Sequence, residues 1–186
     1  MQKILLAIIA AAAVALAAGC TSPLTAEQRA ADKARRELVD SVANALASAR
    51  LDSCTFLIPA RSVQIGSGRV NSVTNEVTNF ICARSGNAMF QLAPNHSIRS
   101  GANGLGGITL EGTLTLRKHS VDRRGNRQWE YSMGTSLGVC RILVDLPARS
   151  AQARVNVQGA FTSGSFTITG PVEPYDRSSV AVGRSL

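Results

Sequence analysis

Apolar residues recur at every second position through most of the chain after residue 55, with polar residues between them. The clearest stretch is 108–118, in which aliphatic residues alternate with Thr, Glu and Arg: Ile108, Leu110, Leu114 and Leu116. A period of two is typical of strands that bury one face. Short polar segments separate the stretches, and residues 122–126 predict a hairpin between the two longest. The pattern therefore predicts a mainly β fold, an antiparallel meander that forms a strongly curved sheet or a small barrel.

Three segments depart from this alternation. Gly112 interrupts the stretch 108–118, and a glycine within a strand often marks a bulge or a sharp bend. Residues 95–107 are rich in Gly, Ser and Asn and predict a loop at the mouth of the barrel. Residues 171–186 have little to bury, so we expect a flexible C-terminal tail.

A helical pattern precedes the strands, from residue 25 to about residue 50, and Thr25 and Gln28 have the spacing of a capping box. Its second half carries an apolar stripe formed by Leu38, Val42 and Leu46 together with Val39 and Ala49. We expect this stripe to pack on the sheet of the same chain; the alternative is a partner helix. The helical residues before the stripe have no such face, and the stretch of about 18 residues from Cys20 to the stripe would span roughly 27 Å as a helical spacer.

The N-terminal segment has the parts of a secretory signal peptide. Lys3 precedes an apolar run from residue 4 to residue 18. A helix that spans a bilayer needs about 20 apolar residues, and neither this run nor any later segment reaches that length. Residues 16–20, Leu-Ala-Ala-Gly-Cys, resemble the lipobox of bacterial lipoproteins, although Ala17 stands where leucine is favoured. The alternative is an ordinary signal peptide that ends beside a cysteine by chance.

The lipobox resemblance implies that the chain is cut before Cys20, which is then acylated with fatty acids such as palmitate. Two or more acyl chains make a stable membrane anchor. Thr21, in place of aspartate, implies the outer membrane, with the protein facing the periplasm or the cell surface. We therefore expect a signal peptide at 1–19, a lipidated N-terminus and helical tether at 20–37, a helix-plus-β domain at 38–170 and the tail at 171–186.

The charge of the chain narrows its partners only slightly. The formal net charge is +8, but the basic residues are scattered along the sequence. Acidic lipid headgroups or polyanionic glycans would be attracted to such a protein, although a mildly basic envelope protein without a charged partner is the simpler interpretation. Export across the membrane argues against nucleic acid as a partner.

Three cysteines remain besides the lipidation site: Cys54, Cys82 and Cys140. An exported protein can form disulfides, but an odd number leaves at least one thiol unpaired. Each of the three lies in phase with an apolar residue two positions away. The sequence is equally compatible with two alternatives. The cysteines are core residues with at most one disulfide, or two of them form a deliberate bridge, of unknown pairing.

No motif for catalysis, metal binding or cofactor binding is present in the sequence, so we predict no catalytic residue, no metal and no cofactor. His96 and His119 have no ligand partner nearby in sequence. Carboxylates are sparse, and Glu111 and Glu130 are expected on the polar faces of neighbouring strands, where salt bridges are the plainer role. A cell-envelope hydrolase built from Glu111, Glu130 or His119 remains an alternative.

Three large residues share one face of a predicted strand: Trp129, Tyr131 and Met133. If that face is the core, they are packing residues, which we favour. If it lines the interior of a barrel, they form the floor of a small apolar pocket.

The order of elements resembles a family of small Bacteroidetes lipoproteins that carry a domain of unknown function. The residues that carry the resemblance are Phe56 to Ile58, Pro59-Ala60-Arg61-Ser62-Val63, Ser67-Gly68, the Gly101 to Gly107 loop, and Leu116-Arg117-Lys118 through Trp129. The resemblance implies a lipocalin-like β domain and assigns no activity. We therefore expect a non-enzymatic envelope lipoprotein that binds a small apolar or amphipathic ligand or serves an outer-membrane assembly. A purely structural protein, whose apolar stripe meets a partner, is a further alternative.

Overall fold

The computed structural model describes residues 25–68, 70–73, 75–93, 107–159 and 165–183. The chain divides into two compact units, 1–36 and 37–186. The expected signal peptide, the lipidation site Cys20 and most of the expected loop at 95–107 lie outside the described residues. Among the described helices, none combines the length and the apolar character needed to cross a bilayer.

Helix α2 (Ala26–Asp52) begins at the predicted capping box. The backbone N–H of Thr25 donates to Oε1 of Gln28 at 2.9 Å, and the backbone N–H of Gln28 donates to Oγ1 of Thr25 at 3.2 Å. The helix buries Ala47, Ser48 and Leu51. The predicted packing of the apolar stripe on the sheet is wrong, because all five of its residues are exposed. A different face of the same helix supplies the buried contacts.

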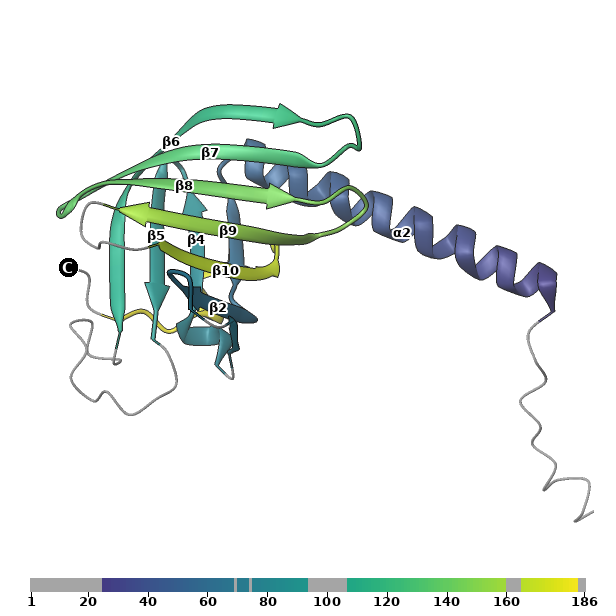
Figure 1. Cartoon of the computed structure of the whole chain (residues 1–186), viewed down its shortest axis with the longest axis horizontal. Helices are drawn as coiled ribbons and strands as arrows, with labels where there is room; N and C mark the ends of the chain where they lie inside the picture. Colours follow the sequence, from purple (N-terminus) through teal and green to yellow (C-terminus); the bar gives the residue numbers. More distant parts are fainter. Residues whose placement is uncertain (1–24, 69, 74, 94–106, 160–164, 184–186) are drawn as a thin grey trace, which may run out of the picture. The chain divides into compact units, whose positions relative to one another are not determined.

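The remaining elements are ten antiparallel strands in one sheet, with the order β1-β4-β5-β6-β7-β8-β9-β10-β2-β3. Their bounds are β1 Phe56–Pro59, β2 Ser62–Ile65, β3 Val70–Ser72, β4 Phe80–Arg84, β5 Asn87–Leu92, β6 Ile108–Val121, β7 Arg127–Thr135, β8 Gly138–Leu146, β9 Gln152–Gly159 and β10 Ser165–Pro171. Two short 3-10 helices, η1 (Glu76–Thr78) and η2 (Arg177–Ser179), complete the described structure. The sheet curls strongly into a half-barrel (Figure 1), which confirms the predicted mainly β, strongly curved fold.

The sheet is a meander only from β4 to β10. Although β1 and β2 are adjacent in sequence, they pair with β4 and β10 at different parts of the sheet. The chain crosses between them at Ala60 and Arg61, whose N–H groups donate to Asn79 and Thr169. A Cβ at Gly170 would overlap the backbone carbonyl of Pro59. The curl therefore brings β1 and β10 so close together that only glycine fits at residue 170.

Strand β6 connects the two parts of the curled sheet. Its first residues pair with β5, and its residues from Gly112 onward pair with β7. Figure 1 shows β7 to β10 crossing β4 and β5 at a steep angle, with β6 bending between the two sets. Of the bulge or sharp bend predicted at Gly112, the bulge lies elsewhere, because the register shifts between Leu116 and Lys118. A Cβ at residue 112 would instead overlap the carbonyl of Gly134 on β7, so close strand approach explains this glycine.

The C-terminal segment 172–183 packs on the outer face of β1, β4 and β5, so the expected flexible tail is wrong for these residues. Leu57 and Glu173 exchange two backbone hydrogen bonds, at 3.0 and 2.7 Å. Gln91 donates to the carbonyl of Ala181 at 2.7 Å and accepts from the N–H of Gly183 at 2.7 Å. The tail covers an outer apolar cluster of Leu57, Phe80, Cys82 and Met89, to which it adds Tyr175 and Val180. The tail thus buries Leu57 of β1 from the outside, whereas Phe56 and Ile58 of the same strand belong to the inner core.

Candidate functional site

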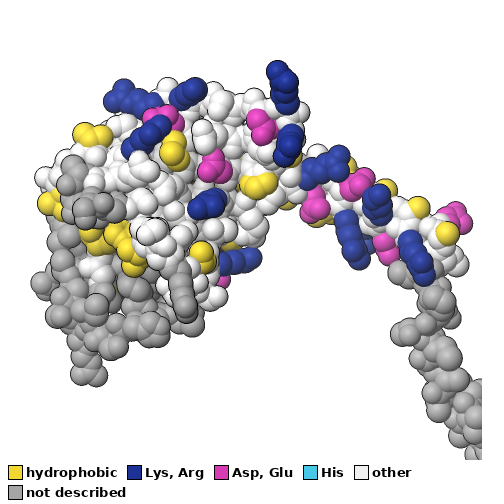
Figure 2. Space-filling view, in the orientation of Figure 1, with side chains coloured by type: hydrophobic (Ala, Val, Ile, Leu, Met, Phe, Trp, Pro, Cys, Tyr) yellow, Lys and Arg dark blue, Asp and Glu magenta, His cyan; other side chains and the backbone are white. Residues whose placement is uncertain are grey.

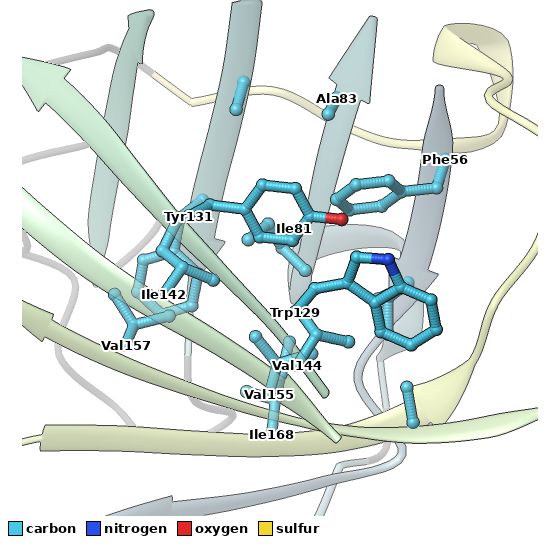
Figure 3. Close-up of a cluster of buried hydrophobic side chains, with 14 of the residues drawn as sticks. Phe56, Ile81, Ala83, Trp129, Tyr131, Ile142, Val144, Val155, Val157 and Ile168 are labelled. Atoms are coloured by element: carbon cyan, nitrogen blue, oxygen red, sulfur yellow. The ribbon is translucent and has the colours of Figure 1, made fainter. Parts of the chain in front are cut away.

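The space enclosed by the curled sheet is filled by side chains. Trp129, Tyr131 and Met133 are each 0% exposed, and they pack with aliphatic residues of β8, β9 and β10 against Phe56 and Ile81 (Figure 3). The rings of Phe56 and Tyr131 lie 6.2 Å apart. The structure therefore gives the three predicted pocket residues the packing role, and neither of the two pockets described below includes them.

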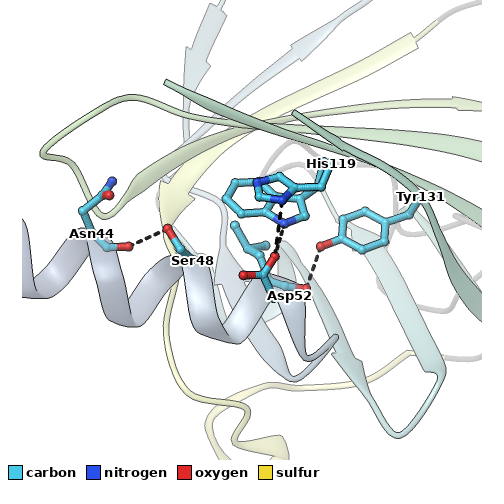
Figure 4. A network of polar contacts seen from close by, with 7 residues as sticks. Asn44, Ser48, Asp52, His119 and Tyr131 are labelled. Atoms are coloured by element: carbon cyan, nitrogen blue, oxygen red, sulfur yellow. Dashed lines mark hydrogen bonds and ion pairs between the residues drawn. The ribbon is translucent and has the colours of Figure 1, made fainter. Parts of the chain in front are cut away.

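The polar ends of the two large aromatic residues are satisfied by the C-terminal end of α2 (Figure 4). Nε1 of Trp129 donates to Oδ1 of Asp52 at 2.8 Å, and the Tyr131 hydroxyl donates to the carbonyl of Leu51 at 2.8 Å. His119 stacks on Trp129 with ring centroids 4.7 Å apart and lies 3.9 Å from the same Asp52 oxygen. Burial raises the pKa of the Tyr131 hydroxyl well above its usual range. These contacts hold the helix on the sheet, which is a structural role.

The three described cysteines are free thiols. Cys140 belongs to the inner core and Cys82 to the outer cluster, so the sheet itself lies between them. Cys54 follows α2 in a left-handed backbone conformation, with φ of 49°. Burial raises the pKa of the Cys82 thiol to about 11 and also raises the pKa of Cys54 and Cys140. A raised thiol pKa opposes nucleophilic chemistry.

A pocket of about 230 Å³ lies between the outer face of β4 to β6 and the tail. We call it the tail pocket; its lining is Cys82, Ala83, Arg84, Asn87, Ala88, Met89, Glu111, Gly112, Tyr175 and Arg177. The Arg84 guanidinium lies 5.4 Å from the centroid of the Tyr175 ring. Within the described residues, neither Arg84 nor Arg177 forms an ion pair with a carboxylate. The pocket thus combines an apolar floor with both signs of charge.

Sequence reasoning missed the tail pocket because it expected the tail to be flexible. The available signal was the few apolar and aromatic side chains of the segment, among them Tyr175 and Val180. A second hollow, of about 510 Å³, lies near the β6–β7 turn and is lined in part by Asp122 and Asp145. Both carboxylates are already engaged, Asp122 within its own turn and Asp145 with Gln128 at 2.7 Å. In the part of the chain that the structure describes, no group of three metal-ligating side chains occurs.

The residues considered for a hydrolase do not converge. Glu130 lies on the outer face and pairs with Arg141 at 2.8 Å, an interaction that lowers the pKa of Glu130. Glu111 lines the tail pocket, and His119 stacks on Trp129 beside α2. The salt-bridge role of Glu130 agrees with the plainer interpretation of the sequence, and its partner is Arg141 on β8. On the face that Figure 2 shows, basic side chains are interspersed with acidic ones.

The apolar stripe of α2 is a row of large hydrophobic residues that the described part of the chain leaves uncovered. Its four large residues, Leu38, Val39, Val42 and Leu46, are 66, 58, 51 and 51% exposed. The opposite side of the helix carries the buried residues and the anchoring contacts. There Asn44 donates to the carbonyls of Pro147 and Ser150 at 3.0 and 2.7 Å.

These features define a class: a mainly β protein in which a strongly curled half-barrel encloses a filled core closed by the end of an N-terminal helix. No family model and no curated protein matches the chain. Among solved structures, the chain is similar to a DUF4251 family protein from Bacteroides eggerthii DSM 20697. The two share 30% sequence identity and a TM-score of 0.60, over 74% of this chain and 91% of that chain. The chain belongs to the DUF4251 family, which confirms the resemblance to a Bacteroidetes domain of unknown function.

Proposed function

We propose that this protein is a lipid-anchored component of the bacterial cell envelope, held at the outer membrane through Cys20. The observation that carries the proposal is the lipobox-like sequence 16–20 at the end of an apolar run. A small pair of residues followed by cysteine at that position provides both the cleavage point and the thiol for acylation. The folded unit 37–186 then acts in the aqueous envelope as a non-enzymatic accessory protein.

The accessory role has two supports in the fold. The enclosed space is filled by Trp129, Tyr131 and their neighbours, so an interior ligand site of the lipocalin type would require the core to open. Glu111, Glu130 and His119 have separate partners and surroundings. What the fold presents outward is the apolar stripe of α2, a contact surface and not a reaction site.

The anchoring is tested by mass spectrometry of the mature protein from a bacterial host. We expect the N-terminal residue to be Cys20 with a diacylglyceryl group on sulfur, and the protein to sediment with membranes. The matched control carries residues 21–186 behind an ordinary signal peptide in place of residues 1–20, and it should appear in the soluble periplasmic fraction without lipid. A mature N-terminus at another residue, or an unmodified Cys20, would refute the proposal.

The tail pocket favours a second candidate function, binding of a small amphipathic ligand. Met89 and Cys82 supply apolar surface, whereas Arg84, Arg177 and Glu111 supply charges for a polar group. Native mass spectrometry after incubation with a lipid extract tests this function. An adduct that persists in Arg123→Ala, on the exposed β6–β7 turn, but is lost in Arg84→Ala would support it. Recovery of only the empty mass would count against it.

A further inference from the structure

Helix α2 has two opposite faces in its C-terminal half. Ala47 and Leu51 are 0% exposed and belong to the core. At about 100° per helical residue, Val42 lies about 180° around the helix from Leu51. The sheet therefore covers one side of the helix, and the apolar stripe points away from the sheet. A flat surface can reach the stripe without displacing any strand.

The stripe is too small to hold a soluble protein partner by itself. Four aliphatic side chains that are half to two-thirds exposed offer roughly 200–300 Å² of apolar surface. A stable protein complex buries about 800 Å² per partner. A dimer of this chain that docked through the stripe alone would bury less than this area. A bilayer sets no such minimum, because its affinity for a helix simply scales with the apolar area buried.

The charged residues of α2 do not favour an anionic or a cationic surface as the partner of the stripe. Helix α2 carries five acidic residues, Glu27, Asp32, Glu37, Asp40 and Asp52, and five basic residues, Arg29, Lys33, Arg35, Arg36 and Arg50. Helices that bind a bilayer through anionic headgroups have an excess of Lys and Arg on the polar face. Contact through α2 would therefore depend on its apolar side chains and not on the headgroup charge.

The lipid on Cys20 supplies the proximity that a small contact needs, and in this respect the inference rests on the proposed function. Residues 21–25 alone separate Cys20 from Ala26, where α2 begins. An anchored chain meets its own bilayer at an effective concentration in roughly the millimolar range, so a contact too weak to recruit a free protein can still form.

We infer that the apolar stripe of α2 lies in the headgroup region of the bilayer that holds Cys20. The sheet then lies on the other side of the helix, in the aqueous envelope. This arrangement places the folded unit against the membrane, whereas the helix length alone suggested a stand-off of roughly 27 Å.

Hydroxyl-radical footprinting of the lipidated protein in phosphatidylethanolamine–phosphatidylglycerol vesicles tests the inference, with unlipidated mature protein (residues 21–186) in solution as reference. We expect oxidation of Leu38, Val42 and Leu46 to fall about threefold or more on the vesicles. Val70 and Val139, each 63% exposed on the sheet, serve as internal controls and should be unchanged. Because charge is not involved, phosphatidylcholine vesicles and high salt should give the same protection.

Several outcomes would overturn the inference. Unchanged oxidation of the stripe in protein that remains on the vesicles would do so while leaving the anchoring intact. Protection that appears only at high protein density would indicate a second copy, and protection only in native membranes would indicate a protein partner. Absence of lipid on Cys20 would instead refute the proposed function. As a variant test, Val42→Glu/Leu46→Glu should lose the protection at Leu38, whereas Val139→Glu should retain it.

Discussion

Replacing Leu51 by alanine is expected to lower the free energy of unfolding by about 3 kcal/mol, within the range measured for buried leucines. Leu51 is 0% exposed at the end of α2 and packs in the inner core. The substitution leaves its carbonyl in place, which keeps the 2.8 Å hydrogen bond from the Tyr131 hydroxyl. The loss therefore comes from packing and from the cavity that the truncated side chain leaves behind.

Leu46→Ala is the matched control, because it removes the same atoms from the same helix. Leu46 is 51% exposed, so its truncation should change the free energy of unfolding by no more than about 0.5 kcal/mol. Both substitutions introduce the best helix former, so a change in helix propensity cannot separate them.

Urea unfolding followed by the fluorescence of Trp129, the single tryptophan of the chain, measures both variants. In thermal unfolding the difference should appear as a melting temperature roughly 6–12 °C lower for Leu51→Ala than for Leu46→Ala. Equal losses in the two variants, or a larger loss for Leu46→Ala, would refute the assignment of the two helix faces. The inference about the bilayer would fail with it.

Three further predictions concern the sheet, the outer cluster and a surface ion pair. Gly170→Ala should destabilise the protein by about 3 kcal/mol or more in urea unfolding, because its Cβ has no room beside β1, whereas Gly134→Ala, with open space around its Cβ, should be nearly neutral. Cys82 should react with iodoacetamide at pH 8 about 100-fold or more slowly than in the unfolded chain, because its pKa of about 11 leaves little thiolate; equal rates by peptide mass spectrometry would contradict its burial. Arg141 lowers the pKa of Glu130 in the folded state, so the pair contributes to the free energy of unfolding at pH values above the unfolded pKa, near 4.3. This contribution is lost as the pH falls through the folded pKa of Glu130. The melting temperatures of wild type and Glu130→Gln should therefore differ slightly at pH 7 and converge in acid, and a constant gap from pH 7 to pH 2.5 would argue against this pair.

The local pattern of the sequence was sufficient for the elements but not for their environment. The alternation in 108–118 and the turn at 122–126 predicted β6, β7 and their hairpin, and Thr25 with Gln28 predicted the start of α2. Such signals depend on neighbours within a few residues, so they can be interpreted without the rest of the fold.

The errors share one physical cause, which is burial by segments far away in sequence. The tail looked flexible because it has few apolar residues, yet Tyr175 and Val180 suffice to cover the outer cluster once β4 and β5 present Phe80 and Met89. No periodicity in residues 171–186 could reveal that surface.

The sequence by itself determined the mainly β class, the helix that precedes the sheet and the residues that fill the core, because the period of two and the helical period are properties of the backbone. Tertiary structure alone decided which side of α2 faces the sheet. The apolar stripe was the obvious candidate by hydrophobicity, but Ala47 and Leu51 occupy the contact. Those two residues lie on the same side of the helix as Asn44, which donates hydrogen bonds to carbonyls of the 147–150 turn. The helix ends just after them at Asp52, which accepts a hydrogen bond from Trp129. Ala47 and Leu51 and the fixed hydrogen-bond partners of Asn44 and Asp52 thus oriented the helix, and the apolar stripe was left exposed.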